Sequence, residues 1–128
     1  MIRLKRAYDP ATPTDGRRVL VERLWPRGVS KRNLRLDAWM KAVAPSPELR
    51  RWFGHDPARW TEFRRRYFEE LRANEAAWQP LLAAARRGRV TLIYAARDVA
   101  HNGALALKTF LDQRLRSRPP TRRGARPS

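Results

Sequence analysis

Val90-Thr91-Leu92-Ile93-Tyr94 is an apolar, β-branched run with almost no polar interruption. A run of this kind is typical of a strand that is buried on both faces of a sheet. A second run, Val19-Leu20-Val21, predicts another buried strand, which we expect to continue through Leu24 and to end near Trp25, because Pro26 cannot donate to a strand ladder. The two runs together favour an α/β fold.

Helices are predicted between and after these runs. Ser46 and Asp56 are each followed by a proline, the pattern of an N-cap residue with proline at the first helical position. Gly54 is expected to end the first of these helices, and Gly88 to follow a later helical segment that restarts at Pro80. The apolar residues at helical spacing are Trp60, Phe63, Tyr67 and Leu71, and in the last helix Leu107, Phe110, Leu111 and Leu115.

Two weaker patterns complete the predicted sheet. Ile2 and Leu4 alternate with basic residues, as in an edge strand, and residues 36–40 predict a short third strand. We therefore expect an α/β fold with a small, mostly parallel sheet of about three to five strands flanked by helices, as a single domain over residues 1–115. Residues 116–128 are dominated by Arg and Pro and are expected to form a disordered tail.

The charge of the chain favours anionic partners. Its 128 residues include 29 basic and 12 acidic side chains, for a net charge of +17, and such a field attracts nucleic acid or phosphorylated small molecules. Of the basic residues 25 are arginine, a skew that codon composition also produces. Without the five arginines from Arg116 onward a charge of +12 is left on the remainder, so the body of the chain is basic in its own right.

Several classes of protein are excluded or disfavoured. The chain has no cysteine, which excludes disulfides, thiolate catalysis and Cys-ligated zinc. No apolar run is long enough to span a bilayer or to serve as a signal core, so we expect a cytoplasmic protein with no membrane partner. Two histidines and scattered carboxylates are not a metal signature, so no metal site is predicted. The cofactor and the oligomeric state stay open.

Functional side chains gather directly after the Val90–Tyr94 run. Ligands of α/β sheets bind beyond the carboxyl ends of strands, and Arg97, Asp98, His101 and Asn102 follow within a few positions. Arg97 is a candidate to bind a phosphate or carboxylate, Asp98 and His101 are candidate acid–base catalytic residues, and Asn102 is a further candidate for substrate binding. The structural alternatives are an Arg97–Asp98 salt bridge, a His101 hydrogen bond to a carbonyl, and helix capping by Asn102.

The end of the other buried strand is a second candidate. Trp25 is suited to stack on a flat ring and Arg27 to bind an anion, although a buried Trp25 would also simply hold the turn. If the two strands are near neighbours with their carboxyl ends together, Arg27 and Arg97 share one rim. Secondary candidates are Arg23, His55 and Asp56, of which the last two also fit the entry to a helix.

Four motifs in order resemble one known family. They are Glu22–Gly28 (ERLWPRG), Ala44-Pro45-Ser46 with Glu48-Leu49-Arg50, Trp52-Phe53 with His55-Asp56-Pro57, and Tyr94–Asp98 (YAARD) with His101-Asn102. The chain resembles the YeaO-like branch of the domain of unknown function 488 over about residues 1–115. That resemblance implies a small bacterial α/β domain with no settled biochemical role. Other branches carry a Cys-His-Arg run near this loop, and thiol chemistry proposed for them does not extend to a chain without cysteine.

Two functions from different classes fit these observations. In the first, a pocket at the strand ends binds an anionic small molecule of phosphate or nucleotide type, with or without catalysis. In the second, the domain binds nucleic acid without reading its sequence, through diffuse arginine contacts and the basic tail. Arginines focused at strand ends would favour the pocket, and arginines spread over an outer face would favour the polyanion.

Overall fold

The computed structural model describes residues 1–117, so most of the predicted tail lies outside the described residues. The elements in chain order are β1 (Ile2–Arg6), β2 (Arg17–Leu20), α1 (Lys31–Leu34), β3 (Ala38–Trp39), α2 (Pro47–Phe53), α3 (Trp60–Arg72), α4 (Glu75–Arg87), β4 (Val90–Tyr94) and α5 (Gly103–Arg116). Short 3₁₀ turns lie at η1 (Pro13–Asp15), η2 (Lys41–Val43) and η3 (Pro57–Arg59).

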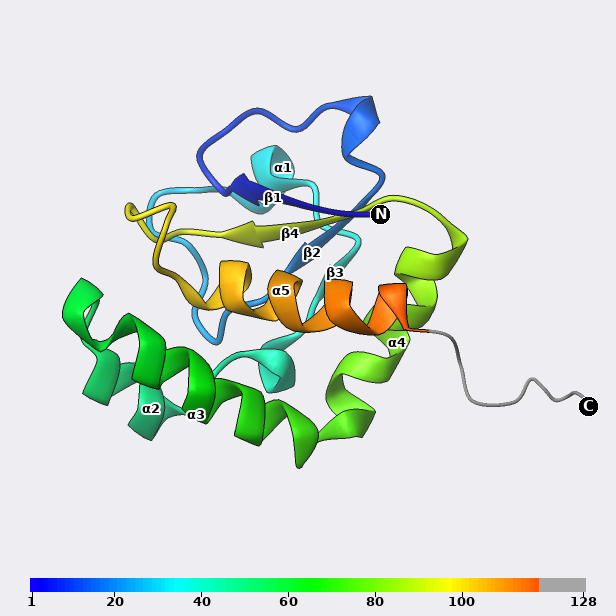
Figure 1. The fold of residues 1–128 in the computed structure, drawn as a ribbon. Coiled ribbons are helices and arrows are strands. Elements are labelled where there is room, and N and C mark those ends of the chain that lie inside the picture. Colours follow the sequence, from blue (N-terminus) through cyan, green and yellow to red (C-terminus); the bar gives the residue numbers. More distant parts are fainter. Residues whose placement is uncertain (118–128) are drawn as a thin grey trace, which may run out of the picture.

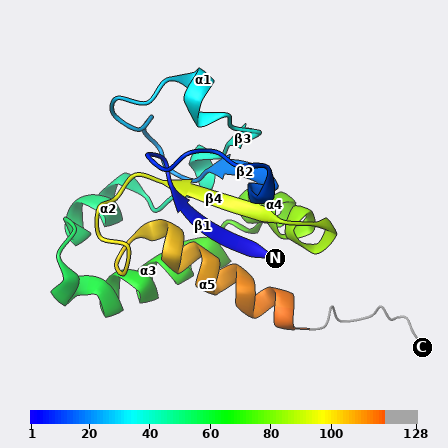
Figure 2. The same ribbon diagram turned by 90° about the horizontal axis from the view of Figure 1, so that it is seen from above.

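The strands form one parallel sheet in the order β1-β4-β2-β3 (Figures 1 and 2). Strand β4 lies between β1 and β2, with Ile2 and Arg17 both paired to Val90. All five residues of β4 are buried, as its sequence predicts for a central strand. The prediction that the two apolar runs are neighbours with the same direction is confirmed.

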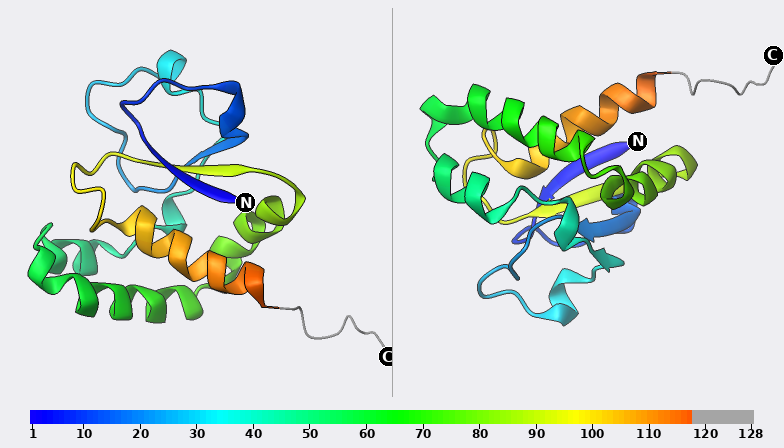
Figure 3. Two further views of the ribbon diagram at one scale, coloured as in Figure 1. Left: turned by 45° about the horizontal axis from the view of Figure 1, so that its top comes forward. Right: turned by 90° about the horizontal axis from the view of Figure 1, so that it is seen from below.

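The two faces of the sheet are covered unequally. Helices α2, α3, α4 and α5 lie on one face, while α1 and the loop that contains η1 lie on the other (Figures 1 and 3). Side chains alternate along a strand, so Val19 and Leu92 belong to the large core under the helices. Leu20 and Ile93 belong to a smaller apolar cluster on the α1 side.

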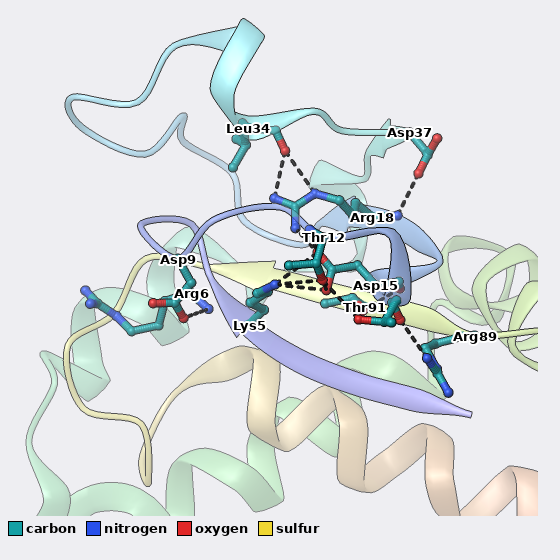
Figure 4. A network of polar contacts seen from close by, with 11 residues as sticks. Lys5, Arg6, Asp9, Thr12, Asp15, Arg18, Leu34, Asp37, Arg89 and Thr91 are labelled. Atoms are coloured by element: carbon teal, nitrogen blue, oxygen red, sulfur yellow. Dashed lines mark hydrogen bonds and ion pairs between the residues drawn. The ribbon is translucent and has the colours of Figure 1, made fainter.

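A buried polar network closes the α1 side (Figure 4). The Asp15 carboxylate accepts hydrogen bonds from Lys5 (2.9 Å), from Arg18 (2.6 Å) and from Thr12. Burial raises the pKa of Asp15, but these hydrogen bonds outweigh it and hold that pKa well below its usual value. The Arg18 guanidinium also donates to the carbonyl of Leu34, which fixes α1 on the sheet.

Local sequence signals set the helix ends. The hydroxyl of Ser46 accepts from the Leu49 amide at the start of α2, and the Asp56 carboxylate accepts from the Ala58 amide at η3, so both predicted N-caps are confirmed. Gly54 ends α2 in the left-handed conformation (φ 55°), also as predicted.

Other predicted boundaries are wrong. Strand β2 ends at Leu20 and does not continue to Leu24, because the Ala95 amide beyond β4 donates to the side chain of Glu22 and the backbone ladder stops. Helix α4 begins at Glu75 and not at Pro80, which lies inside it. Pro80 has no amide N–H to donate to the carbonyl of Ala76, but Ala76 is exposed, so that carbonyl is open to solvent and the helix continues. Helix α1 was not predicted, because a single turn shows no apolar periodicity.

Candidate ligand-binding site

A cavity of about 540 Å³ lies beyond the carboxyl ends of β2 and β4. Its walls come from the segment after β2, the segment after β4, the first turn of α5, and α2 with the loops around it. The lining residues are Tyr8, Val21, Glu22, Arg23, Leu24, Trp25, Pro26, Arg27, Ala44, Pro45, Arg50, Phe53, His55, Phe63, Ala95, Ala96, Asn102, Gly103 and Ala104.

The cavity brings together only part of the predicted site. Trp25, Arg27 and Asn102 line it, as do the secondary candidates Arg23 and His55. Four other predicted site residues are absent from the lining: Arg97, Asp98, His101 and Asp56. The strand-end segment after β4 contributes its small residues and the start of α5 to the cavity instead of its charged side chains.

Arg27 and Arg50 are the cationic side chains of the cavity without protein partners. Both are exposed, and within residues 1–117 neither guanidinium forms a hydrogen bond or an ion pair with the protein. Arg27 follows β2 and Arg50 lies on α2, so two separate elements bring positive charge to one cavity. Arg50 was not predicted, because an exposed arginine on a short helix looks like a solvated surface residue.

Arg23 and Trp25 have bonds that hold the cavity wall. The Arg23 guanidinium donates to the carbonyls of Pro45 (3.0 Å) and Ala44 (3.3 Å), which ties the segment after β2 to the loop before α2. The indole N–H of the half-buried Trp25 donates to the carbonyl of Val29 at 2.6 Å, a bond that fits the structural alternative in which Trp25 holds the turn.

Glu22 is the acidic residue of the cavity and was missed by the sequence reasoning. Its carboxylate accepts from the Ala95 amide at 3.2 Å. Burial raises the pKa of Glu22, while this hydrogen bond and the nearby charges of Arg50 and His55 oppose the rise. The available signal was a single carboxylate directly after the apolar run Val19-Leu20-Val21.

Two of the charged or titratable residues after β4, Asp98 and His101, bond to each other. Asp98 Oδ2 lies 2.9 Å from His101 Nδ1, and the ring of His101 packs edge-on against Trp60. The hydrogen bond from His101 lowers the pKa of Asp98. No ion pair joins Arg97 to Asp98 among the described residues, and Arg97 is exposed. The Asp98–His101 pair therefore stands in place of both structural alternatives, the Arg97–Asp98 salt bridge and the bond from His101 to a carbonyl.

Asn102 begins α5. Its side-chain oxygen accepts from the Leu105 amide (2.8 Å), and its side-chain nitrogen donates to the Asp98 carbonyl (3.0 Å), so the predicted capping role is confirmed. His55 has a positive φ of 59° directly after the end of α2. That conformation, together with the Asp56 cap that follows, places His55 at the cavity and Asp56 outside it.

The described part of the chain contains neither a metal-binding cluster nor a membrane-spanning helix. Within residues 1–117 no group of three or more His, Cys, Asp or Glu side chains is arranged to hold a metal ion. Among the same residues, no helix has the length and the apolar character that crossing a membrane requires.

Comparison with known proteins places the chain in a family. It is 43% identical to the uncharacterized protein YeaO of Escherichia coli K12 over 110 residues, which are 86% of this chain and 96% of that protein. It is 44% identical over 113 residues to the uncharacterized proteins Mb3100c of Mycobacterium bovis and Rv3073c of Mycobacterium tuberculosis H37Rv, which covers 88% of this chain and 95% of each relative. No solved structure matches the chain.

These relatives confirm the YeaO-like resemblance that the four motifs carry. A family model described as the inactive DUF488-N3 subclade matches residues 1–128. The chain therefore belongs to the DUF488 family, in the subclade described as inactive DUF488-N3.

Proposed function

We propose that this protein binds a small anionic molecule of nucleotide type in the cavity at the carboxyl ends of β2 and β4, and that it does not transform that molecule. The observation that carries the proposal is the pair Arg27 and Arg50, two guanidiniums that line one cavity and have no acceptor in the described protein. Guanidiniums are suited to bidentate contacts with phosphate. The cavity volume, about 540 Å³, is within the usual range for small-molecule sites of about 300–1,000 Å³.

The remaining walls suit a ligand that is more than a bare phosphate. Phe53, Pro45 and Trp25 give the cavity apolar and flat surfaces, which suit a planar ring. Glu22 offers a partly buried carboxyl group that is able to accept a hydrogen bond from a ring N–H or amino group. A molecule with a phosphate at one end and a nitrogen heterocycle at the other matches both halves of this lining.

Two further observations favour binding over catalysis. The Asp98–His101 pair lies outside the cavity lining, so these candidate acid–base residues are not positioned on a ligand there. We propose that the pair instead holds the loop that leads into α5. The description of the subclade as inactive agrees with a site that has kept a ligand cavity without a reaction.

The test is a thermal-shift titration with adenosine monophosphate, inorganic phosphate and adenosine. A ligand raises the melting temperature only by binding the native state. We expect the monophosphate to stabilise the wild-type protein most, because it uses both the arginines and the flat walls. We expect Arg27→Gln and Arg50→Gln each to weaken its binding about 10- to 100-fold, since a hydrogen bond to a charged group contributes about 1.5–3 kcal/mol.

Arg51→Gln is the matched control. Arg51 is the neighbour of Arg50 on α2, it is exposed, and it does not line the cavity. This variant removes the same charge and should bind the monophosphate like the wild type. Equal losses in Arg50→Gln and Arg51→Gln would mean that the anion responds to overall charge, and the cavity proposal would be abandoned.

A further inference from the structure

A second concentration of positive charge lies at the opposite edge of the sheet, where the strands begin. In Figure 1 the start of β1, the end of α4 and the end of α5 all lie on the right of the molecule. We call the arginines of these elements and their neighbours the amino-edge surface. It consists of Arg17, Arg72, Arg86, Arg87, Arg89, Arg114 and Arg116.

Contacts between these elements show that the surface is continuous. The Arg17 amide donates to the Arg89 carbonyl at 3.0 Å, which joins the start of β2 to the residue before β4. The Arg86 side chain reaches the Arg114 carbonyl at 3.4 Å, which joins the ends of α4 and α5. Arg72, the last residue of α3, is close enough to Arg114 that its charge helps to lower the pKa of Arg114, after the larger effect of burial.

Arg114 is held in place by aromatic rings. Its guanidinium carbon lies 3.7 Å from the centroid of the Phe110 ring and 5.0 Å from that of Trp78. Stacking of this kind limits the freedom of the side chain before any partner binds. Arg114, which lies close to the charge of Arg72, is therefore also held in place by packing.

Two arginines in the middle of α3, Arg65 and Arg66, show the contrast. Arg65 forms ion pairs with Glu62 and Glu69, and Arg66 pairs with Glu62, so their charges are compensated on the same helix. On the amino-edge surface no arginine forms an ion pair among the described residues. Glu75 is the acidic side chain whose charge reaches Arg114 there, and the net charge of the surface stays strongly positive.

We propose that the amino-edge surface binds the phosphate backbone of nucleic acid without reading its sequence. Arginines spread over several elements, all exposed except the half-buried Arg114, match a polymer with regularly spaced phosphates better than a single small anion. A membrane surface is the weaker alternative, because Met1 is the one large exposed apolar residue at this edge among the described residues. The proposal is independent of the cavity, which lies at the other edge of the sheet.

The experiment measures binding of a labelled DNA duplex of about 20 base pairs to the full chain between about 50 and 200 mM salt, because each phosphate contact contributes a slope of about −0.9 in log K against log salt. The edge variant carries Arg17→Gln, Arg87→Gln and Arg116→Gln, all exposed residues without ion pairs among the described residues. The control variant carries Lys31→Gln, Arg32→Gln and Arg51→Gln, which removes the same charge from exposed positions elsewhere.

We expect the edge variant to lose about 2 to 3 units of this slope and at least tenfold in affinity at the higher salt, while the control keeps the wild-type slope within about one unit. Melting curves establish that both variants are folded, and Arg87→Gln alone should still cost about one unit of slope. Equal losses in the two triple variants, or no DNA binding by the wild type, would overturn the proposal. So would loss of binding to anionic phospholipid vesicles in the edge variant with DNA binding unchanged.

Discussion

At the scale of single residues, Glu22 links the end of β2 to the chemistry of the cavity. Its carboxylate accepts a hydrogen bond from the Ala95 amide, which would otherwise donate to the next carbonyl of the strand ladder. Glu22 also lines the cavity together with Arg50 and His55. Because burial dominates, the folded protein holds a proton on Glu22 more tightly than the unfolded chain does. The stability of the protein should therefore depend on the protonation of this one carboxyl group.

Replacing Glu22 with Gln tests that dependence. Burial raises the folded pKa of Glu22 above its ordinary value, so ionised Glu22 costs stability, and the cost grows as pH rises above the ordinary pKa of a glutamate. We expect Glu22→Gln to melt a few degrees higher than the wild type at pH 7 and to lose this advantage toward pH 4. Glu48→Gln, at an exposed position on α2, is the control.

Melting temperatures that differ between wild type and Glu22→Gln by the same amount at every pH would contradict the assignment. Arg50 and His55 are the charged groups that act on Glu22.

At the scale of elements, one close backbone approach fixes β2 against β4. Gly16 has a φ of 66°, and a Cβ added there would lie 2.4 Å from the carbonyl oxygen of Arg89. The Arg17 amide donates to that same oxygen, so the two strands begin in register only if residue 16 has no side chain. Gly28 has a similar φ of 79° but no atom within 4 Å of the added Cβ.

These two glycines form a matched pair for urea unfolding. We expect Gly28→Ala to lower the free energy of unfolding by about 1 kcal/mol, the ordinary cost of alanine at positive φ. Gly16→Ala meets the same strain and in addition a backbone clash, so we expect a loss of about 3 kcal/mol or more. Similar losses in the two variants would show that β2 shifts away from Arg89 at little cost.

Elements with strong local signals could be predicted from the sequence. The run from Val90 to Tyr94 is β-branched and uninterrupted, and Ser46-Pro47 and Asp56-Pro57 carry their own capping chemistry. The start of α4 was wrongly predicted at Pro80, because a proline at the start of a helix and a proline inside one look alike in sequence. Which of the two occurs depends on whether solvent reaches the carbonyl that the proline leaves without a donor.

The candidate site could be predicted only in part, because a contact between distant parts of the chain sets the path after β4. The path of the chain after β4 is set by Arg6, whose guanidinium donates to the carbonyls of Ala96 (2.9 Å) and Ala95 (3.1 Å). No local pattern reveals a bond between residues so far apart in the chain. The small residues at 95 and 96 line the cavity, and the charged pair that follows lies outside its lining.

At the scale of the whole molecule, the parallel sheet separates two sites of positive charge. The cavity lies where β2 and β4 end, and the amino-edge surface lies where they begin. Figure 1 shows the two ends of β4 in the ribbon. Helices α2 to α5 cover one face between them, and α1 with the Asp15 network covers the other. A small anionic ligand and a polyanion would therefore bind without competing for the same side chains.

The central claim is that the cavity at the strand ends binds a nucleotide-type anion, and a crystal structure with adenosine monophosphate tests it most directly. We expect density for the phosphate between the guanidiniums of Arg27 and Arg50, with the ring against the wall that contains Glu22. Density for the phosphate beside Arg97 and His101 or on the amino-edge surface, with no ligand in the cavity, would contradict the account.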